Sequence, residues 1–238
     1  MKDNISITVV TVTYNALDAL RRTMASVEAQ NYTDIDYIVV DGASTDGTPD
    51  FLETCHSESL RCVSEPDGGI YDAMNKGIAM AKGDYCIFMN AGDVFVGPSV
   101  VSSVVAQMTG EEDVVYGDIM KNGMRVVARE PRNCHRMYYC HQSAFVRTDC
   151  LRAFPFDVKH RMSADFKQAK QLFLAGKRFR HVDVVVADFD TTGVSNTRRS
   201  DGLWDNITVI WEVDGLADKA KLLPRILFSY IMCKLRGK

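Results

Sequence analysis

Three short segments of the sequence combine acidic side chains with glycine, and each follows a run of apolar residues. They are Asp41–Gly47, Glu65–Gly69 and Asn90–Asp93. Asp and Gly are ordinary turn residues, and Ser44 or Thr45 could cap a helix, so each segment also has a purely structural interpretation. Carboxylates held close together repel one another unless a cation or hydrogen-bond donors compensate their charge. Together the three segments favour a site for a divalent metal ion and a phosphorylated ligand.

The elements that must position these segments are predicted from the apolar pattern. Ile5–Tyr14 is rich in β-branched residues and nearly continuous in apolar character, which is typical of a parallel strand buried on both faces. Strands and helices then alternate, with strands at 35–40, 60–64 and 85–89 and helices at 17–30, from 48 and at 71–81. Asn15 could cap the first helix. This order predicts an open parallel sheet, in which ligands bind beyond the carboxyl ends of the strands.

The second half of the chain predicts a mixed sheet. A helix is expected at 100–108 and a strand at 114–116, and Met120–Arg125 contains the Asn-Gly pair of a tight hairpin. We therefore expect an α/β fold with a mixed, mainly parallel central sheet flanked by helices.

Composition excludes several classes of protein. The chain has 238 residues, of which 46% are hydrophobic, enough for one sizeable core and too many for a disordered chain. A net charge of -3 provides no chain-wide positive field, so nucleic-acid binding is not expected. Seven cysteines without a C-x-x-C pair, and a strand-like start in place of a signal peptide, predict a cytoplasmic protein with reduced thiols.

Five motifs in a fixed order carry a resemblance to a known family. They read T-V-T-Y-N, V-D-G-A-S-T-D-G-T, E-P-D-G-G-I-Y-D-A-M-N-K-G-I, A-K-G-D-Y and N-A-G-D. The order resembles family 2 glycosyltransferases of the GT-A fold, strongly over residues 5–95 and more weakly through His141 and Asp165 to Gly193. Within the family the chain is most similar to bacterial enzymes that build capsule, exopolysaccharide or O-antigen units, including the colanic-acid type. The resemblance implies a Rossmann-like GT-A domain with a C-terminal helical appendage.

The resemblance also implies which residues bind the donor, a UDP- or GDP-sugar. Asp41 would contact the nucleotide base or ribose, and Thr13 and Asn15 would frame the base pocket. The residues that would line the ribose and diphosphate are Asp67, Asp72, Asn75 and Lys76.

Asn90 and Asp93 fall where the family has its metal-binding D-x-D motif. The resemblance implies that Asp93 binds Mn²⁺ or Mg²⁺ and that Asn90 lines the substrate. Many relatives have two or three aspartates here, whereas Ala91 and Gly92 leave a single carboxylate in this turn. Mg²⁺ can bind through one or two carboxylates together with substrate phosphates, so we expect weak metal affinity without nucleotide.

Asp165 is the expected catalytic base. A sugar hydroxyl that attacks an anomeric carbon with inversion must lose its proton. Asp165 follows Ser163 at the start of a segment with helical apolar spacing, where the resemblance implies the catalytic carboxylate. The alternative is that Asp165 only stabilises the helix N-terminus. Ala164 stands where some relatives have a second acid.

His141 is a further candidate for substrate binding. His141-Gln142 is predicted to lie on a strand, where the imidazole could position the acceptor or the diphosphate, or could be a buried core histidine. The pairs Cys134-His135 and Cys140-His141 also suggest zinc, but adjacent residues of an extended segment point to opposite faces, which argues against it.

Two segments near the C-terminus carry basic side chains. Arg198 and Arg199, which follow Gly193–Asn196, could bind phosphate as a lid over the donor or could lie in a solvated loop. Leu222–Lys238 combines apolar residues at helical spacing with four basic side chains and no acid, and it is too short and too charged to span a bilayer. It favours peripheral contact with the inner face of a membrane; the alternative is a helix packed on the domain or in a homodimer.

The sequence and the resemblance together predict an inverting, metal-dependent glycosyltransferase. It would move a sugar from a nucleoside diphosphate donor to a glycan or lipid-linked acceptor in bacterial surface polysaccharide synthesis. Residues 1–200 would form the catalytic domain, with a nucleotide-sugar half to about 118 and an acceptor half from 119, and 201–238 a helical segment. The alternatives are a non-catalytic nucleotide-sugar-binding protein and a sugar-phosphate nucleotidyltransferase. The latter normally has a Gly-rich basic loop after its first strand, where this chain has Asn15–Asp18.

Overall fold

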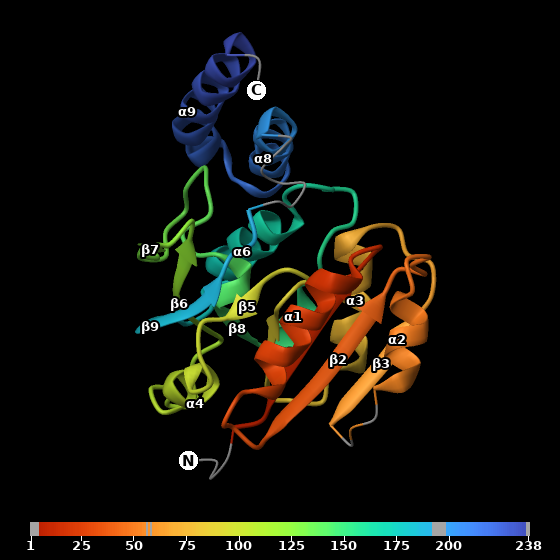
Figure 1. The fold of residues 1–238 in the computed structure, drawn as a ribbon. Coiled ribbons are helices and arrows are strands. Elements are labelled where there is room, and N and C mark those ends of the chain that lie inside the picture. The colour runs from red at the N-terminus through yellow and green to blue at the C-terminus, as the bar shows by residue number, and fades with distance from the viewer. Residues whose placement is uncertain (1–4, 56, 58, 192–198, 237–238) are drawn as a thin grey trace.

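The computed structural model describes residues 5–55, 57, 59–191 and 199–236, and these residues build one mixed sheet with helices on both faces (Figure 1). The strands are β1 (Ile7–Thr13), β2 (Ile35–Asp41), β3 (Leu60–Ser64), β4 (Tyr85–Phe88), β5 (Val94–Phe95), β6 (Val114–Lys121), β7 (Met124–Val126), β8 (Ala144–Arg147) and β9 (Phe179–Asp188). The helices are α1 (Leu17–Glu28), α2 (Thr48–Thr54), α3 (Ile70–Met80), α4 (Val100–Val105), α5 (Thr148–Ala153), α6 (Ala164–Leu174), α8 (Arg199–Val213) and α9 (Leu216–Leu235), with a 3₁₀ turn η1 (His141–Ser143).

The sheet has the order β3-β2-β1-β4-β8-β6-β9-β5, with β7 paired to β6. β1 to β4 are parallel, as the alternation of strands and helices predicts. β8 runs antiparallel between β4 and β6, whereas β6 and β9 are parallel. The predicted α/β class with a mixed, mainly parallel sheet is therefore confirmed.

Two apolar clusters cover the two faces of the sheet. In β1, Val10 and Val12 pack with α3, while Val9 packs on the opposite side with α1, as the period of two along a strand requires. A methyl group at Gly77 in α3 would overlap the side chain of Val10, so glycine allows this helix to lie close against β1.

A third cluster joins the C-terminal helices to the domain. Val209 and Ile210 of α8 and Leu222 and Ile226 of α9 pack with Phe166 of α6. Figure 1 shows α8 and α9 stacked beyond α6 at one end of the molecule. One face of α9 is therefore packed on the domain, as the alternative to membrane contact predicts, while its other face is exposed. In the part of the chain that the structure describes, no helix has the length and apolarity needed to cross a membrane.

Several local predictions are wrong. β6 continues to Lys121 because the polar Asp118 within it is paired with His181 at 2.8 Å and with Arg125. Asn15 does not cap α1: the N-cap is Ala16, and Asn15 has a positive φ of 49°. His141 lies on the 3₁₀ turn, and the strand begins only at Ala144.

Candidate active site

The loops that follow β1 to β4 lie at one edge of the sheet, and the carboxylate of Asp41 organises the second of them. Asp41 is fully buried. It accepts hydrogen bonds from the backbone N–H of Ser44 at 3.0 Å and from Ser64 Oγ at 2.6 Å, and the Ser44 hydroxyl also donates to it. Asp41 therefore holds the β2–α2 loop against the end of β3, and it lies below the surface of this edge.

Asn15 ties the β1–α1 loop to the same structure. Its backbone N–H donates to Ser44 Oγ at 2.7 Å, and its Oδ1 accepts from the backbone N–H of Thr45 at 2.8 Å. Asn15 and Ala43 both have positive φ, 49° and 59°, which non-glycine residues rarely adopt. Such strain persists only where surrounding contacts impose it, often at ligand sites. A hollow of about 350 Å³ opens here, lined partly by Asn15 and Asp46.

The 65–69 loop is held by the side chains predicted to line the ribose and diphosphate. Asp67 and Asp72 each accept a hydrogen bond from a glycine N–H of this loop, at 2.8 and 2.9 Å. Lys76 Nζ donates to a loop carbonyl at 2.8 Å and pairs with Glu65 at 2.8 Å. These three predicted residues therefore lie together, partly exposed, on one side of the edge.

Asn75 is engaged elsewhere. Its Nδ2 donates to the carbonyl of Phe156 at 2.8 Å, and its Oδ1 accepts from the backbone N–H of Phe156 at 3.0 Å. Both ends of the amide are thus used to tie α3 to the segment before α6. The position is that of a framework residue, and donor binding by Asn75 stays a prediction.

Asp93 lies buried in the turn after β4, with 4% of its surface exposed. Gln142 Nε2 donates to Oδ2 at 3.0 Å, and the backbone N–H of Asp190 donates to Oδ1 at 2.9 Å. Burial above all, and the charge of Asp190 in addition, raise the pKa of Asp93 above its usual value. A cation beside this carboxylate would offset both effects.

A second carboxylate reaches this turn from a distant part of the sequence. Gly92 has a φ of 108°, and a methyl group on it would collide with the carboxylate of Asp190. Glycine thus lets Asp190 lie against the turn. Sequence reasoning missed Asp190 because its position depends on the pairing of β9 with β5. The carboxylates of Asp93 and Asp190 and the unpartnered Oδ1 of Asn90 belong to this turn or lie against it, and such oxygen groups are the ligands that Mn²⁺ and Mg²⁺ prefer.

A hydrogen-bond chain connects this turn to the predicted base. Asn90 Nδ2 lies 3.2 Å from His141 Nε2, and His141 Nδ1 lies 3.2 Å from Asp165 Oδ2. An amide nitrogen only donates, so His141 Nε2 accepts and the imidazole proton lies on Nδ1, facing Asp165. His141 therefore bridges the donor side and the acceptor side.

Asp165 lies in the first turn of α6 and is 19% exposed. Its Oδ1 accepts hydrogen bonds from Tyr71 Oη at 3.0 Å and from the backbone N–H of Phe166 at 2.8 Å. Burial acts to raise the pKa of Asp165, but the hydrogen bonds from His141, Phe166 and Tyr71 outweigh burial, and the pKa lies below its usual value. Asp165 is thus ionised at neutral pH and able to accept a proton. The bond to Phe166 shows that Asp165 also supports the helix N-terminus.

Two buried oxygen atoms at the edge have no hydrogen-bond partner among the described residues: Thr13 Oγ1 and Asn90 Oδ1. Leaving such a group unpaired costs about 1–3 kcal/mol. A bound ligand that supplied a donor or a cation would recover this energy, which agrees with the substrate-binding roles predicted for both residues.

Two other predictions fare differently. Arg198, with Gly193–Asn196, lies outside the described residues, whereas Arg199 is exposed in the first turn of α8. The zinc pattern does not form a metal site: Cys134 and Cys140 donate to oxygen atoms of Arg136 and Gln142, each at 2.7 Å.

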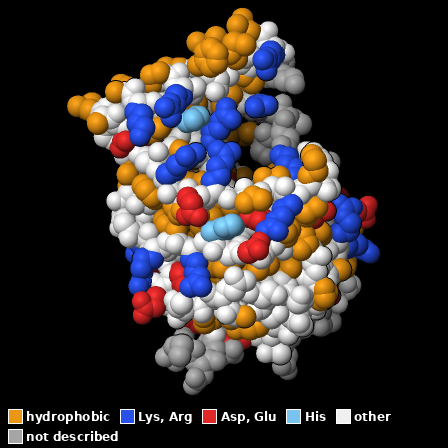
Figure 2. Space-filling view, turned by 90° about the vertical axis from the view of Figure 1, so that its left-hand side faces the viewer, with side chains coloured by type: hydrophobic (Ala, Val, Ile, Leu, Met, Phe, Trp, Pro, Cys, Tyr) orange, Lys and Arg blue, Asp and Glu red, His pale blue; other side chains and the backbone are white. Residues whose placement is uncertain are grey.

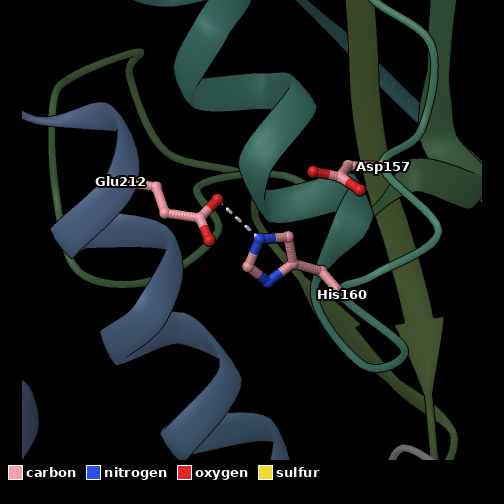
Figure 3. Close-up of side chains that lie close together, drawn as sticks. All are labelled: Asp157, His160 and Glu212. Carbon is pink, nitrogen blue, oxygen red and sulfur yellow. Dashed lines mark hydrogen bonds and ion pairs between the residues drawn. The ribbon is translucent and has the colours of Figure 1, made fainter.

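A cluster of potential metal ligands outside the edge is already filled by a lysine. Figure 3 shows Asp157, His160 and Glu212 directed toward one another, the last from α8. Lys167 Nζ lies 2.7 Å from Asp157 Oδ2 and 3.3 Å from His160 Nε2, and it also pairs with Glu212. The ammonium group takes the place a cation would need, so this cluster joins α6 to α8 as an ion-pair network.

Comparison with known proteins identifies the family. Residues 8–166 match the family described as Glycosyl transferase family 2. An uncharacterized glycosyltransferase of Mycobacterium tuberculosis is 32% identical over 214 residues, which cover 85% of this chain and 81% of the relative. A PGL/p-HBAD biosynthesis glycosyltransferase of Mycobacterium bovis is 29% identical over 197 residues, covering 78% and 77%.

Solved structures share the fold. S. aureus TarS 1-349 in complex with UDP-GlcNAc has a TM-score of 0.72 at 17% identity, covering 95% of this chain and 72% of TarS. The mannosyltransferase PcManGT from Pyrobaculum calidifontis, in complex with GDP-Man and Mn²⁺, has a TM-score of 0.71 at 19% identity, covering 90% and 66%. At these identities the likeness establishes the fold, and it confirms the predicted GT-A arrangement.

Proposed function

Because this chain belongs to glycosyl transferase family 2, we propose that it transfers a sugar from a UDP- or GDP-sugar to a glycan or lipid-linked acceptor. We propose further that the transfer inverts the anomeric centre and needs Mn²⁺ or Mg²⁺. The nucleotide sugars bound by TarS and PcManGT support the donor class. The bacterial relative named for PGL/p-HBAD biosynthesis supports a biosynthetic role, which we propose to be bacterial surface polysaccharide synthesis.

The observation that carries the proposal is the hydrogen-bond chain Asn90–His141–Asp165. It links the turn that would hold the metal and the diphosphate to an ionised carboxylate on the acceptor half. An inverting transfer needs a group that stabilises the leaving diphosphate on one side of the anomeric carbon and a base for the attacking hydroxyl on the opposite side. A protein that only bound nucleotide sugars would not need the ionised carboxylate of Asp165 on the acceptor side.

The residues divide the work as follows. Asp93 and Asp190, with Asn90 Oδ1, would hold the metal, which supplies positive charge to the leaving diphosphate. Asp165 accepts the proton of the attacking hydroxyl, and His141 fixes the orientation of that carboxylate. Tyr71 donates to Asp165 Oδ1 and leaves Oδ2 toward the imidazole.

We also propose that the catalytic domain ends near residue 200, with the nucleotide-sugar half to about 118 and the acceptor half following it. Residues 201–238 would form the helical segment, in which α8 and α9 pack on each other and on Phe166. A lipid-linked acceptor would be met at the inner face of a membrane.

Thermal unfolding with a panel of UDP-, GDP- and dTDP-sugars, with and without Mn²⁺, tests the donor and metal roles. A ligand at 100 times its Kd stabilises by about 2.7 kcal/mol. We expect one nucleotide class to stabilise the protein, and Asp93→Ala to abolish the Mn²⁺-dependent part. Asp50→Ala, which removes an exposed carboxylate from α2, is the matched control. If Asp93→Ala responds to Mn²⁺ and donor as the control does, the assigned metal site is wrong.

A further inference from the structure

Exposed arginines gather where the 127–140 segment, which joins β7 to η1, meets α9. We call Arg129, Arg132, Arg136 and Arg225 the arginine patch, and all four side chains are exposed. Figure 2 shows Lys and Arg side chains around a histidine on this face, below an apolar end of the molecule. The patch belongs neither to the candidate active site nor to the Lys167 network.

Backbone and side-chain contacts fix the patch in place. Arg136 Nη2 donates to Ser229 Oγ of α9 at 3.2 Å, and that hydroxyl donates to the carbonyl of Arg225 at 3.1 Å. The backbone N–H of Arg129 donates to the carbonyl of Tyr138 at 2.7 Å, which brings the two ends of the segment together. Burial and the charges of all four arginines lower the pKa of the neighbouring His135.

The patch lacks counter-charges. Elsewhere in the described residues, Arg61, Arg125 and Arg180 pair with carboxylates at 3.0 Å or less. None of the four patch arginines forms such a pair with any described residue, although Glu130 lies in the same segment. Like charges held together without partners favour an external anion, and guanidinium groups bind phosphate through paired N–H donors.

An exposed apolar strip of α9 runs beside the patch. Phe228, Ile231 and Leu235 are 68%, 53% and 76% exposed, while the packed side of the same helix is formed by Leu222 and Ile226. At about 100° per residue these three apolar side chains fall within about 60° of one another. The helix therefore presents apolar side chains to solvent next to unpaired arginines.

We propose that the arginine patch binds the phosphate groups of anionic lipids at a membrane surface while the apolar strip of α9 enters the interface. Charge complementarity selects this occupant. The chain carries a net charge of -3, so an anionic surface attracts this face and repels much of the rest, which fixes the orientation of the protein. A second copy docked about a twofold axis would bring the four arginines against their own equivalents.

The inference rests on the proposed function only in that a lipid-linked acceptor would lie in the surface to which the protein binds. The 127–140 segment runs directly into His141. Membrane contact through this segment would bring the surface to the acceptor side of the active site.

Vesicle co-sedimentation of the full chain, without donor or acceptor, tests the proposal. The vesicles are phosphatidylcholine alone or with about 30 mol% phosphatidylglycerol. We expect binding to the anionic vesicles that weakens as salt rises from about 0.05 to 0.5 M. Each arginine removed should weaken binding about fivefold, so Arg132→Gln with Arg136→Gln should weaken it about 25-fold.

The matched control is Arg21→Gln with Arg22→Gln, which makes the same charge change on α1. Phe228→Ser with Leu235→Ser, both exposed, should weaken the binding that persists at high salt. Equal binding to both kinds of vesicle, or equal losses in the patch and control variants, would overturn the proposal. Because these vesicles contain neither substrate, the outcome is independent of the thermal-unfolding test of the proposed function.

Discussion

Replacing Asp165 by asparagine separates the base from its structural role. The asparagine Oδ1 can still accept the hydrogen bonds from Tyr71 and from the backbone N–H of Phe166. Its Nδ2, however, would meet the Nδ1–H of His141, so that two donors face each other. The variant therefore loses the negative charge and the link to His141, while the start of α6 keeps its support.

The size of the effect follows from these contacts. Removing a general base lowers turnover by about 10² to 10⁴, which corresponds to about 3–5 kcal/mol of activation free energy. Loss of one hydrogen bond to a charged group costs about 1.5–3 kcal/mol of stability. Donor affinity should change little, because Asp165 lies beyond the turn proposed to bind the metal.

The assay is release of nucleoside diphosphate from the donor that stabilises the protein most, with thermal unfolding as the check on folding. Asp149→Asn is the matched control, since Asp149 is an exposed acid in the first turn of α5, where its charge also favours the helix N-terminus. If Asp165→Asn loses no more turnover than Asp149→Asn, Asp165 is a helix-terminal residue and the assigned mechanism fails.

Three further outcomes are expected. His141→Ala removes the group that lowers the pKa of Asp165, so the acid limb of the pH–rate profile should move to higher pH; an unmoved limb would contradict the pairing. Gly92→Ala introduces a side chain at positive φ against a neighbouring carboxylate, and Mn²⁺-dependent stabilisation by donor should fall while stabilisation by donor alone persists. Lys170→Met breaks a buried ion pair with Asp214 at 2.8 Å and should lower the free energy of unfolding, measured with urea, by about 3–5 kcal/mol. Adding Asp214→Leu should restore most of that free energy.

The sequence predicted the parallel half of the sheet well. β1, β2 and β4 are short and mostly apolar, and each ends in a polar or glycine-containing loop, so that periodicity and turn chemistry agree. The edge that holds Asn15, Asp41 and Asp93 could therefore be located from the sequence. Asp165 could be placed at a helix start for the same reason.

What the sequence could not predict depends on tertiary contacts. Asp190 reaches the Asp93 turn because β9 pairs with β5, which has only two residues and gives no periodic signal. The extension of β6 depends on partners for Asp118 that lie on other strands. Lys167 is buried between Asp157 of the loop before α6 and Glu212 of α8, a contact that no local pattern indicates.

The antiparallel strand β8 connects the two parts of the sheet that carry the candidate active-site residues. It pairs with β4 on one side and with β6 on the other, so the turn that bears Asp93 and the turn that bears His141 extend from adjacent strands of one continuous sheet. The proposed donor and acceptor halves therefore share this sheet, and the spacing between the Asp93 turn and the His141 turn is set when the sheet folds. Adaptation to a different acceptor must then take place in connecting segments such as 127–140. Exchanging those segments between relatives should alter acceptor choice while the donor side keeps its geometry.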